Sequence, residues 1–423
     1  MKRASPPVDQ PHTADRPNMT TNTERLELRR RRMAQSPPIL RGGFRPFFLG
    51  AGAWALIALT IWLAFLFGWD SARLIDDPVA WHRHEMLFGF AGAAIAGFAL
   101  TAVPNWTGRL PIAGGALAGL FGLWLMGRIV PLTTAGHPVA SALLDGGFQI
   151  LLAFLLGREI VRSGNRNVPV VAIIAAFGIA STLDRLEMGG VVDVGAIGWR
   201  GGLALVAVLI ALIGGRIVPS FTRNWLASQG CEGRLPAQAD RFDLAIMVLG
   251  GMALLSWLAL PGSLSSGWLL LGAGIGHALR LARWQGWRCA SNALVAILHM
   301  GYGWLSAGLM LLGLAAFDLV TETLAVHALT TGAIATMILA VMTRATLGHT
   351  GRPLMASGIT KLSYVLITVA AVARVLAGLA IAPSHALMAV AGAAWCAAFT
   401  LFLLEYGPML WSPRLDEHKV ART

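Results

Sequence analysis

The sequence predicts an all-α polytopic membrane protein with about twelve transmembrane helices, and two observations predict this fold class. The 423 residues are 56% hydrophobic and only 13% charged, whereas a soluble globular domain carries roughly 25% charged residues. Apolar runs also recur along the chain at close to the roughly 20 residues that a helix needs to cross a bilayer. Too little charge is left to cover a water-facing surface, so much of the surface must face lipid.

The expected helices follow in chain order between two polar tails. Residues 1–40 are polar and rich in Pro and Arg, which predicts a disordered cytoplasmic tail. Residues 41–410 form the membrane domain, and residues 411–423 form a second cytoplasmic tail. The apolar runs lie at about 47–69, 86–104, 111–130, 139–157, 168–183, 197–218, 242–260, 265–283, 291–316, 324–343, 361–381 and 384–405.

Basic residues are divided unevenly between the two sets of connecting loops. One set carries Arg73, Arg83, Arg128, Arg185 and little else. The positive-inside rule therefore predicts cytoplasmic termini and a multi-pass protein of the bacterial inner membrane. It also accounts for the net charge of +12, so we expect no nucleic-acid binding. The richer set carries Arg109, Arg158, Arg162, Arg166, Arg216, Arg223, Arg234, Arg241, Arg280, Arg283, Arg288, Arg344, Arg352, Lys361, Arg414 and Lys419.

Three helix ends resemble one another and indicate an internal repeat. The segments 101–109, 216–225 and 342–352 are rich in Thr and Arg. They end the second, sixth and tenth helices, all at the cytoplasmic face of the membrane. Three parallel repeats of four helices would form a pseudo-threefold bundle with its axis along the membrane normal. The alternative is that such residues mark any cytoplasmic helix end.

Histidines at the start of the second and tenth helices are the first candidate functional residues, since ionisable groups inside a bilayer are costly unless they are paired or coordinated. His82 and His84 stand in Trp-His-Arg-His-Glu-Met at 81–86, and Glu85 could orient a ring by accepting its second N–H. If the repeat holds, His327 lies at their level. Facing imidazoles are a usual way to hold haem b, and imidazole also suits copper. The alternative for the second helix is an interfacial polar cap.

Further candidates lie deeper or at the other face. His299 in the ninth helix, with Tyr302 one turn on, needs a partner or a metal, and a satisfied core histidine is the alternative. His349 follows the tenth helix, while His277 in the eighth is expected to be structural.

The arginines and cysteines limit how a cofactor could be bound. Arg200 and Arg374 fall inside spans and need anions, which haem propionates or acidic side chains such as Asp145 would supply. The three cysteines are far apart with no CxxC pair, so neither covalent haem attachment nor a thiolate metal site is expected.

The chain resembles the NnrS family at the residues that carry these patterns. The resemblance implies a twelve-span membrane protein that contains haem and copper and acts in nitric oxide metabolism and resistance to nitrosative stress. It carries over His82, His84, His299, His327 and His349 as candidate ligands, surrounded by Glu85, Tyr302, Arg216 and Arg344. The matching stretches are Phe-Arg-Pro-Phe-Phe at 44–48, Trp-His-Arg-His-Glu-Met at 81–86, Asn-Trp-Thr-Gly at 105–108, Gly-Arg at 215–216, Leu-His-Met-Gly-Tyr at 298–302, His327 and Leu-Gly-His-Thr-Gly-Arg at 347–352.

Three functions stay open at this point. A haem- and copper-containing protein could bind nitric oxide, or reduce it as an oxidoreductase resembling a nitric oxide reductase, with a quinol or another electron donor. A transporter of a metal or metal complex is the alternative, because twelve spans and internal repeats also suit that class. A sensor or assembly factor would bind the gas without turnover. Which histidine holds haem and which holds copper does not follow from the sequence.

Overall fold

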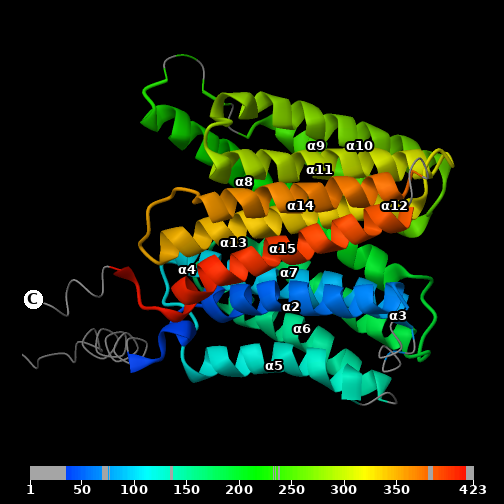
Figure 1. The fold of residues 1–423 in the computed structure, drawn as a ribbon, viewed down its shortest axis with the longest axis horizontal. Helices are drawn as coiled ribbons and strands as arrows, with labels where there is room; N and C mark the ends of the chain where they lie inside the picture. The colour runs from blue at the N-terminus through cyan, green and yellow to red at the C-terminus, as the bar shows by residue number, and fades with distance from the viewer. Residues whose placement is uncertain are drawn as a thin grey trace, which may run out of the picture.

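The structure is a computed structural model that describes residues 35–68, 75, 77–133, 137–231, 233, 235–236, 239–379 and 384–415. Figure 1 shows the helices side by side in one elongated bundle, and the described chain begins and ends at the same end of it. We call this the terminal end and the opposite one the distal end. Residues 1–34 and 416–423 of the two expected tails lie outside the described residues, while Pro38–Leu40 form a short 3-10 helix.

All twelve predicted spans are helical, so the predicted fold class is confirmed. Two spans are composite, and in each a π-helical segment joins two α-helices: α3 (Pro78–His84), η3 (Glu85–Ala91) and α4 (Gly92–Thr107) in one, and α12 (Glu322–His327), η5 (Ala328–Ile334) and α13 (Ala335–His349) in the other. The remaining spans are α2 (Phe44–Leu66), α5 (Gly115–Thr133), α6 (Pro138–Arg162), α7 (Val168–Met188), α8 (Ile197–Ser228), α9 (Arg241–Ala259), α10 (Leu264–Arg283), α11 (Ala293–Ala315), α14 (Gly358–Ala377) and α15 (Ser384–Trp411).

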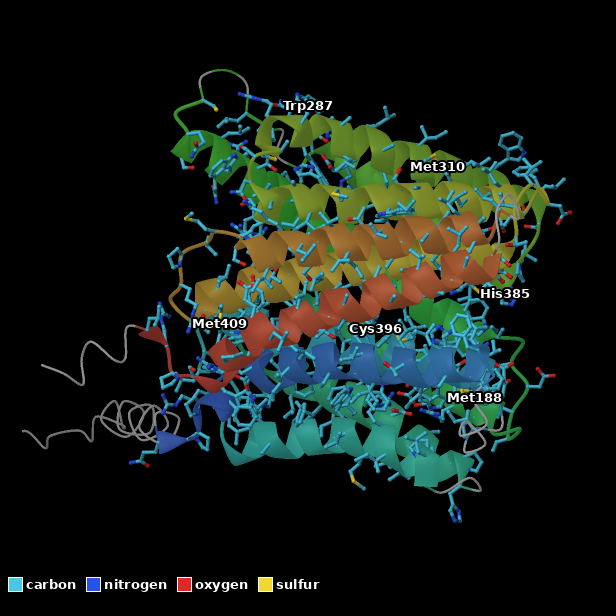
Figure 2. All side chains as sticks on the ribbon, in the orientation of Figure 1. Met188, Trp287, Met310, His385, Cys396 and Met409 are labelled. Carbon is cyan, nitrogen blue, oxygen red and sulfur yellow. The ribbon has the colours of Figure 1, made fainter. Side chains whose placement is uncertain are left out.

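Among the described residues, eleven of these spans are long and apolar enough to cross a membrane. The exception is α10, which carries His277, Arg280 and Arg283 and packs against α9 and α11. Figure 2 shows how α15 runs through the bundle, from His385 at the distal end to Met409 at the terminal end.

Helix pairings repeat three times along the chain. The last helix of each four-helix unit packs on the first helix of the next, since α6 packs on α7, α10 on α11 and α15 on α2. The second helix of each unit lies at the centre, where α4 contacts α13 and α8 contacts both η3 and η5. These three spans are also among the most buried. The pairings are those expected of three four-helix units around one axis.

Candidate functional site

A cavity of about 460 Å³ lies between α2, α3, α8, α12, α14 and α15. Figure 1 places α3 and α12 at the distal end of the bundle, so the cavity belongs to the distal half. Most of its wall is apolar, with Trp62, Trp199 and Trp395 among the lining residues. His82 from α3 and His327 from α12 both line it. The structure therefore brings together two of the five histidines that the sequence singled out.

The imidazole of His327 is fixed by its own helix. Its Nδ1–H donates a hydrogen bond to the carbonyl oxygen of Thr323, one turn earlier, at 2.8 Å. Because a carbonyl oxygen can only accept, this bond assigns the proton to Nδ1 and leaves the lone pair on Nε2. A ring in this tautomer is ready to bind a metal through Nε2.

The imidazole of His82 is fixed by stacking instead. Its ring lies nearly parallel to that of Trp62 on α2, with centroids 4.5 Å apart and an interplanar angle of 16°. Its Nδ1 is buried and has no hydrogen-bond partner among the described residues.

Positive charge gathers around this cavity. Arg374 on α14 lines the wall and forms no hydrogen bond or ion pair with any described residue. Arg83 lines the wall as well, and its guanidinium pairs with Asp184 at 2.9 Å. Glu322 is already paired with Arg200 at 3.1 Å. An unpaired guanidinium in an apolar wall is costly, so the cavity suits a ligand that carries a carboxylate.

Each of the two helices that supply the cavity histidines turns π-helical at the same point. The segment η3 begins directly after His84, and η5 begins directly after His327. Segments of this kind are frequent at functional sites. They also make His84, rather than His82, the positional counterpart of His327 in the repeat.

His84 does not line the cavity but points toward α6 and α7. Its Nδ1 lies 2.7 Å from a carboxylate oxygen of Asp184, and its Nε2 lies 3.2 Å from one of Asp145. Both ring nitrogens are therefore engaged, and neither is open to a metal in this arrangement. Asp184 and Asp145, rather than Glu85, orient the ring.

Glu85 instead belongs to a buried ion network. Its carboxylate pairs with Arg128 and, at 2.8 Å, with Arg185, and it accepts a hydrogen bond from Nε1 of Trp54 at 3.0 Å. Asp145 pairs with the same two arginines. Together with Asp184 and Arg83, the network holds three carboxylates and three guanidiniums, and it joins α2, α3, η3, α5, α6 and α7. Arg128 thus has acidic partners and needs no cofactor to neutralise it.

His299 and His349 lie at the terminal end, far from the cavity. Along the composite span, His349 is about 30 Å from His327 at 1.5 Å per residue, and it packs against Phe44 with ring centroids 5.4 Å apart. His299 Nε2 lies 2.9 Å from Oγ1 of Thr222. Its Nδ1 is buried without a partner and faces Gly286.

The residues predicted to surround the ligands have other partners. The Tyr302 hydroxyl lies 2.8 Å from Nδ1 of His277 and 2.8 Å from Arg280, which itself pairs with Asp243 at 2.6 Å. This is a second polar cluster, which joins α9 and α10 of the middle four-helix unit to α11. Two arginines are separate from it: Arg216 donates to Asn167 at 2.6 Å, and Arg344 lies over the ring of Phe221 at 3.9 Å.

Sequence reasoning missed the role of Trp62. A tryptophan near the end of a membrane helix is ordinary interfacial placement, and no spacing links it to His82, which lies on the next span. Arg374 could be identified from the sequence, because its charge falls inside an apolar run, and in the structure it lines the cavity.

The described part of the chain has no cluster of three or more side chains that could bind a metal ion without haem. No three His, Cys, Asp or Glu side chains gather there in a way that could hold one. Cys231 is exposed and Cys289 is buried, and neither forms a disulfide. The copper that the resemblance implies stays a prediction.

The match to a known family covers nearly the whole bundle. No curated protein matches the chain. The family model described as NnrS protein matches residues 38–414, which include both composite spans and all five candidate histidines. The chain therefore belongs to the NnrS family, the membrane proteins of the nitric oxide response.

Proposed function

We propose that the protein binds haem b in the distal cavity through His82 and His327, and that this haem binds nitric oxide. The observation that carries the proposal is the pair of imidazoles, from two helices, in one cavity of about 460 Å³. Cofactor pockets in proteins measure roughly 300–1,000 Å³ and are mostly apolar. Imidazoles from neighbouring helices are a usual way to hold haem b in a bundle.

The rest of the wall also fits a porphyrin. Aromatic side chains such as Trp199 and Trp395 suit its flat apolar faces. Its carboxylates need cations, and Arg374 lines the cavity without another partner among the described residues. Guanidinium and carboxylate form strong paired hydrogen bonds, so the haem would resolve the unpaired charge of Arg374.

The chemistry at this site follows from what each part supplies. Bound haem would supply an iron centre that binds nitric oxide. The apolar wall would keep water away and admit an uncharged gas from the surrounding lipid. Reduction of the gas would also need electrons and protons, so binding is the function for which these residues account.

The distribution of arginines also supports an orientation of the protein in the membrane. The arginine-rich loops lie at the terminal end, and the positive-inside rule places such loops in the cytoplasm. The distal cavity would then lie in the outer half of the bacterial inner membrane, and both termini would be cytoplasmic.

Haem content of purified variants tests the function. We expect protein made with ample haem to show a Soret band and stoichiometric haem b by the pyridine haemochrome assay. His82→Ala and His327→Ala change that spectrum, whereas the matched terminal-end variants His299→Ala and His349→Ala leave it unchanged. Wild-type protein without haem, or equal losses at both ends of the bundle, would overturn the proposal. Counterflow of a metal complex in proteoliposomes, without bound haem, would support the transporter instead.

A further inference from the structure

The two cavity imidazoles differ in the partner that each offers to the proton on its Nδ1. When Nε2 of a histidine binds a metal, the ring proton must sit on Nδ1. At His327 that proton has an acceptor, because the Thr323 carbonyl lies 2.8 Å from Nδ1. At His82 it has none, because Nδ1 is buried without a hydrogen-bond partner.

This difference makes the two rings unequal as ligands. A hydrogen bond from Nδ1–H to a carbonyl fixes the tautomer and raises the basicity of Nε2, which strengthens the bond to a metal. A buried N–H without an acceptor carries the full penalty of lost hydration. Ligation by His82 imposes that penalty, and ligation by His327 does not.

The other contacts of the two rings also indicate that His327 is the stronger ligand. The His82 ring is held by its stack on Trp62, with centroids 4.5 Å apart. Stacking restrains the plane of a ring but, unlike a hydrogen bond, gives neither ring nitrogen a polar partner. His327 is held by a directional bond within its own helix, and His82 is held by a surface from a different helix.

We propose that His327 is the permanent ligand of the haem and that His82 is an exchangeable one, which a gas molecule replaces. The inference rests on the proposed function. In the exchange, the coordinate bond from Nε2 of His82 breaks and one from the gas forms, while no electron or proton is transferred. Trp62 is a positioning residue, which acts by holding the His82 ring plane.

Substitution of each histidine in the full-length protein tests whether the two ligands differ in this way. The readouts are the coordination state from absorption and EPR spectra, the rate of haem loss to apomyoglobin, and the rate of carbon monoxide binding. His82→Ala should keep its haem, become five-coordinate and high-spin, and bind carbon monoxide at least about tenfold faster. His327→Ala should lose haem at least about tenfold faster than His82→Ala, and added imidazole should slow that loss.

Trp62 provides a test that leaves both ligands in place. Trp62→Leu removes the stack and should raise the five-coordinate fraction and the rate of carbon monoxide binding. Trp62→Phe preserves a flat ring and should stay close to the wild type. If both Trp62 variants matched the wild type, His82 would not be held as we infer.

Two results would overturn the inequality while the proposed function stands. One is equal rates of haem loss from His82→Ala and His327→Ala, and the other is loss from His82→Ala alone. Absence of haem from the wild type, by contrast, would remove the proposed function and this inference together.

Discussion

Arg185 lies between the carboxylates of Glu85 and Asp145, and its guanidinium pairs with them at 2.8 and 2.7 Å. All three side chains are buried. They come from η3, α6 and α7, so one guanidinium joins two spans of the first four-helix unit to the first span of the next. The opposite charges are equal in number across the network, and this balance is what makes it tolerable in an apolar interior.

Removal of Arg185 should therefore destabilise the bundle strongly. Arg185→Met leaves Glu85 and Asp145 to share the guanidinium of Arg128, so the buried network has one carboxylate in excess. Breaking a buried pair from one side costs about 3–5 kcal/mol. We expect a clear fall in the unfolding midpoint of the protein in detergent, measured from tryptophan fluorescence. Arg158→Met is the matched control, because Arg158 pairs at the surface with its neighbour Glu159 and such pairs contribute about 0–1 kcal/mol. Equal midpoints for the two variants would mean that the buried network adds no stability.

Arg374 should matter for haem retention rather than for folding. Arg374→Gln removes the cation that would bind a haem carboxylate, and a hydrogen bond to a charged group is worth about 1.5–3 kcal/mol. We expect haem affinity to fall roughly tenfold to a hundredfold, measured by haem transfer to apomyoglobin. Arg216→Gln should leave it unchanged, since Arg216 lies outside the cavity wall. Unaltered retention in Arg374→Gln would show that another group neutralises the haem.

Cys231 should report the orientation of the protein in the membrane. It is exposed, in the connection between α8 and α9 at the terminal end, whereas Cys289 is buried. If that end is cytoplasmic, a membrane-impermeant maleimide should label inverted vesicles and leave right-side-out vesicles unlabelled. Cys231→Ser serves as the control for the site of labelling. Labelling of right-side-out vesicles alone would place the termini outside.

The start of α9 should show a defined pH dependence. Asp240 lies just before α9, and hydrogen bonds from Arg283 and from the backbone N–H of Asp243 hold its pKa below the ordinary value of 3.8. A lowered pKa stabilises the fold above pH 3.8 and ceases to do so as the pH falls through the lowered value. Asp240→Asn keeps the cap but cannot ionise.

The unfolding midpoint measured against pH checks this dependence. The gap between wild type and Asp240→Asn should be constant above about pH 5 and should close below pH 3.8. A gap that persisted unchanged at low pH would exclude ionisation of Asp240 as its cause.

The sequence predicted the spans and part of the site because both leave local signals. Hydropathy over about 20 residues is a property of each helix alone, and it located all twelve. The repeat put His327 at the level of the second helix, and both His82 and His327 line one cavity. Arg374 was singled out by its charge inside an apolar run.

The other parts of the site depend on contacts between distant segments. The partners of His84 come from α6 and α7, so nothing near His84 in the sequence shows that both nitrogens are engaged. Tyr302 lies one turn after His299, yet its hydroxyl meets His277 and Arg280 on α10. Which face of a helix meets which neighbour is decided by packing across the bundle.

The π-helical segments η3 and η5 separate the two halves of each composite span. One added residue in a helix of 3.6 residues per turn shifts the phase of everything after it by about 100°. The distal half can thus present its side chains to different neighbours from those of the terminal half, which lies along the central axis. Because of this phase shift, substitutions that change the shape of the cavity need not disturb the central contacts of α4, α8 and α13, around which the three units assemble.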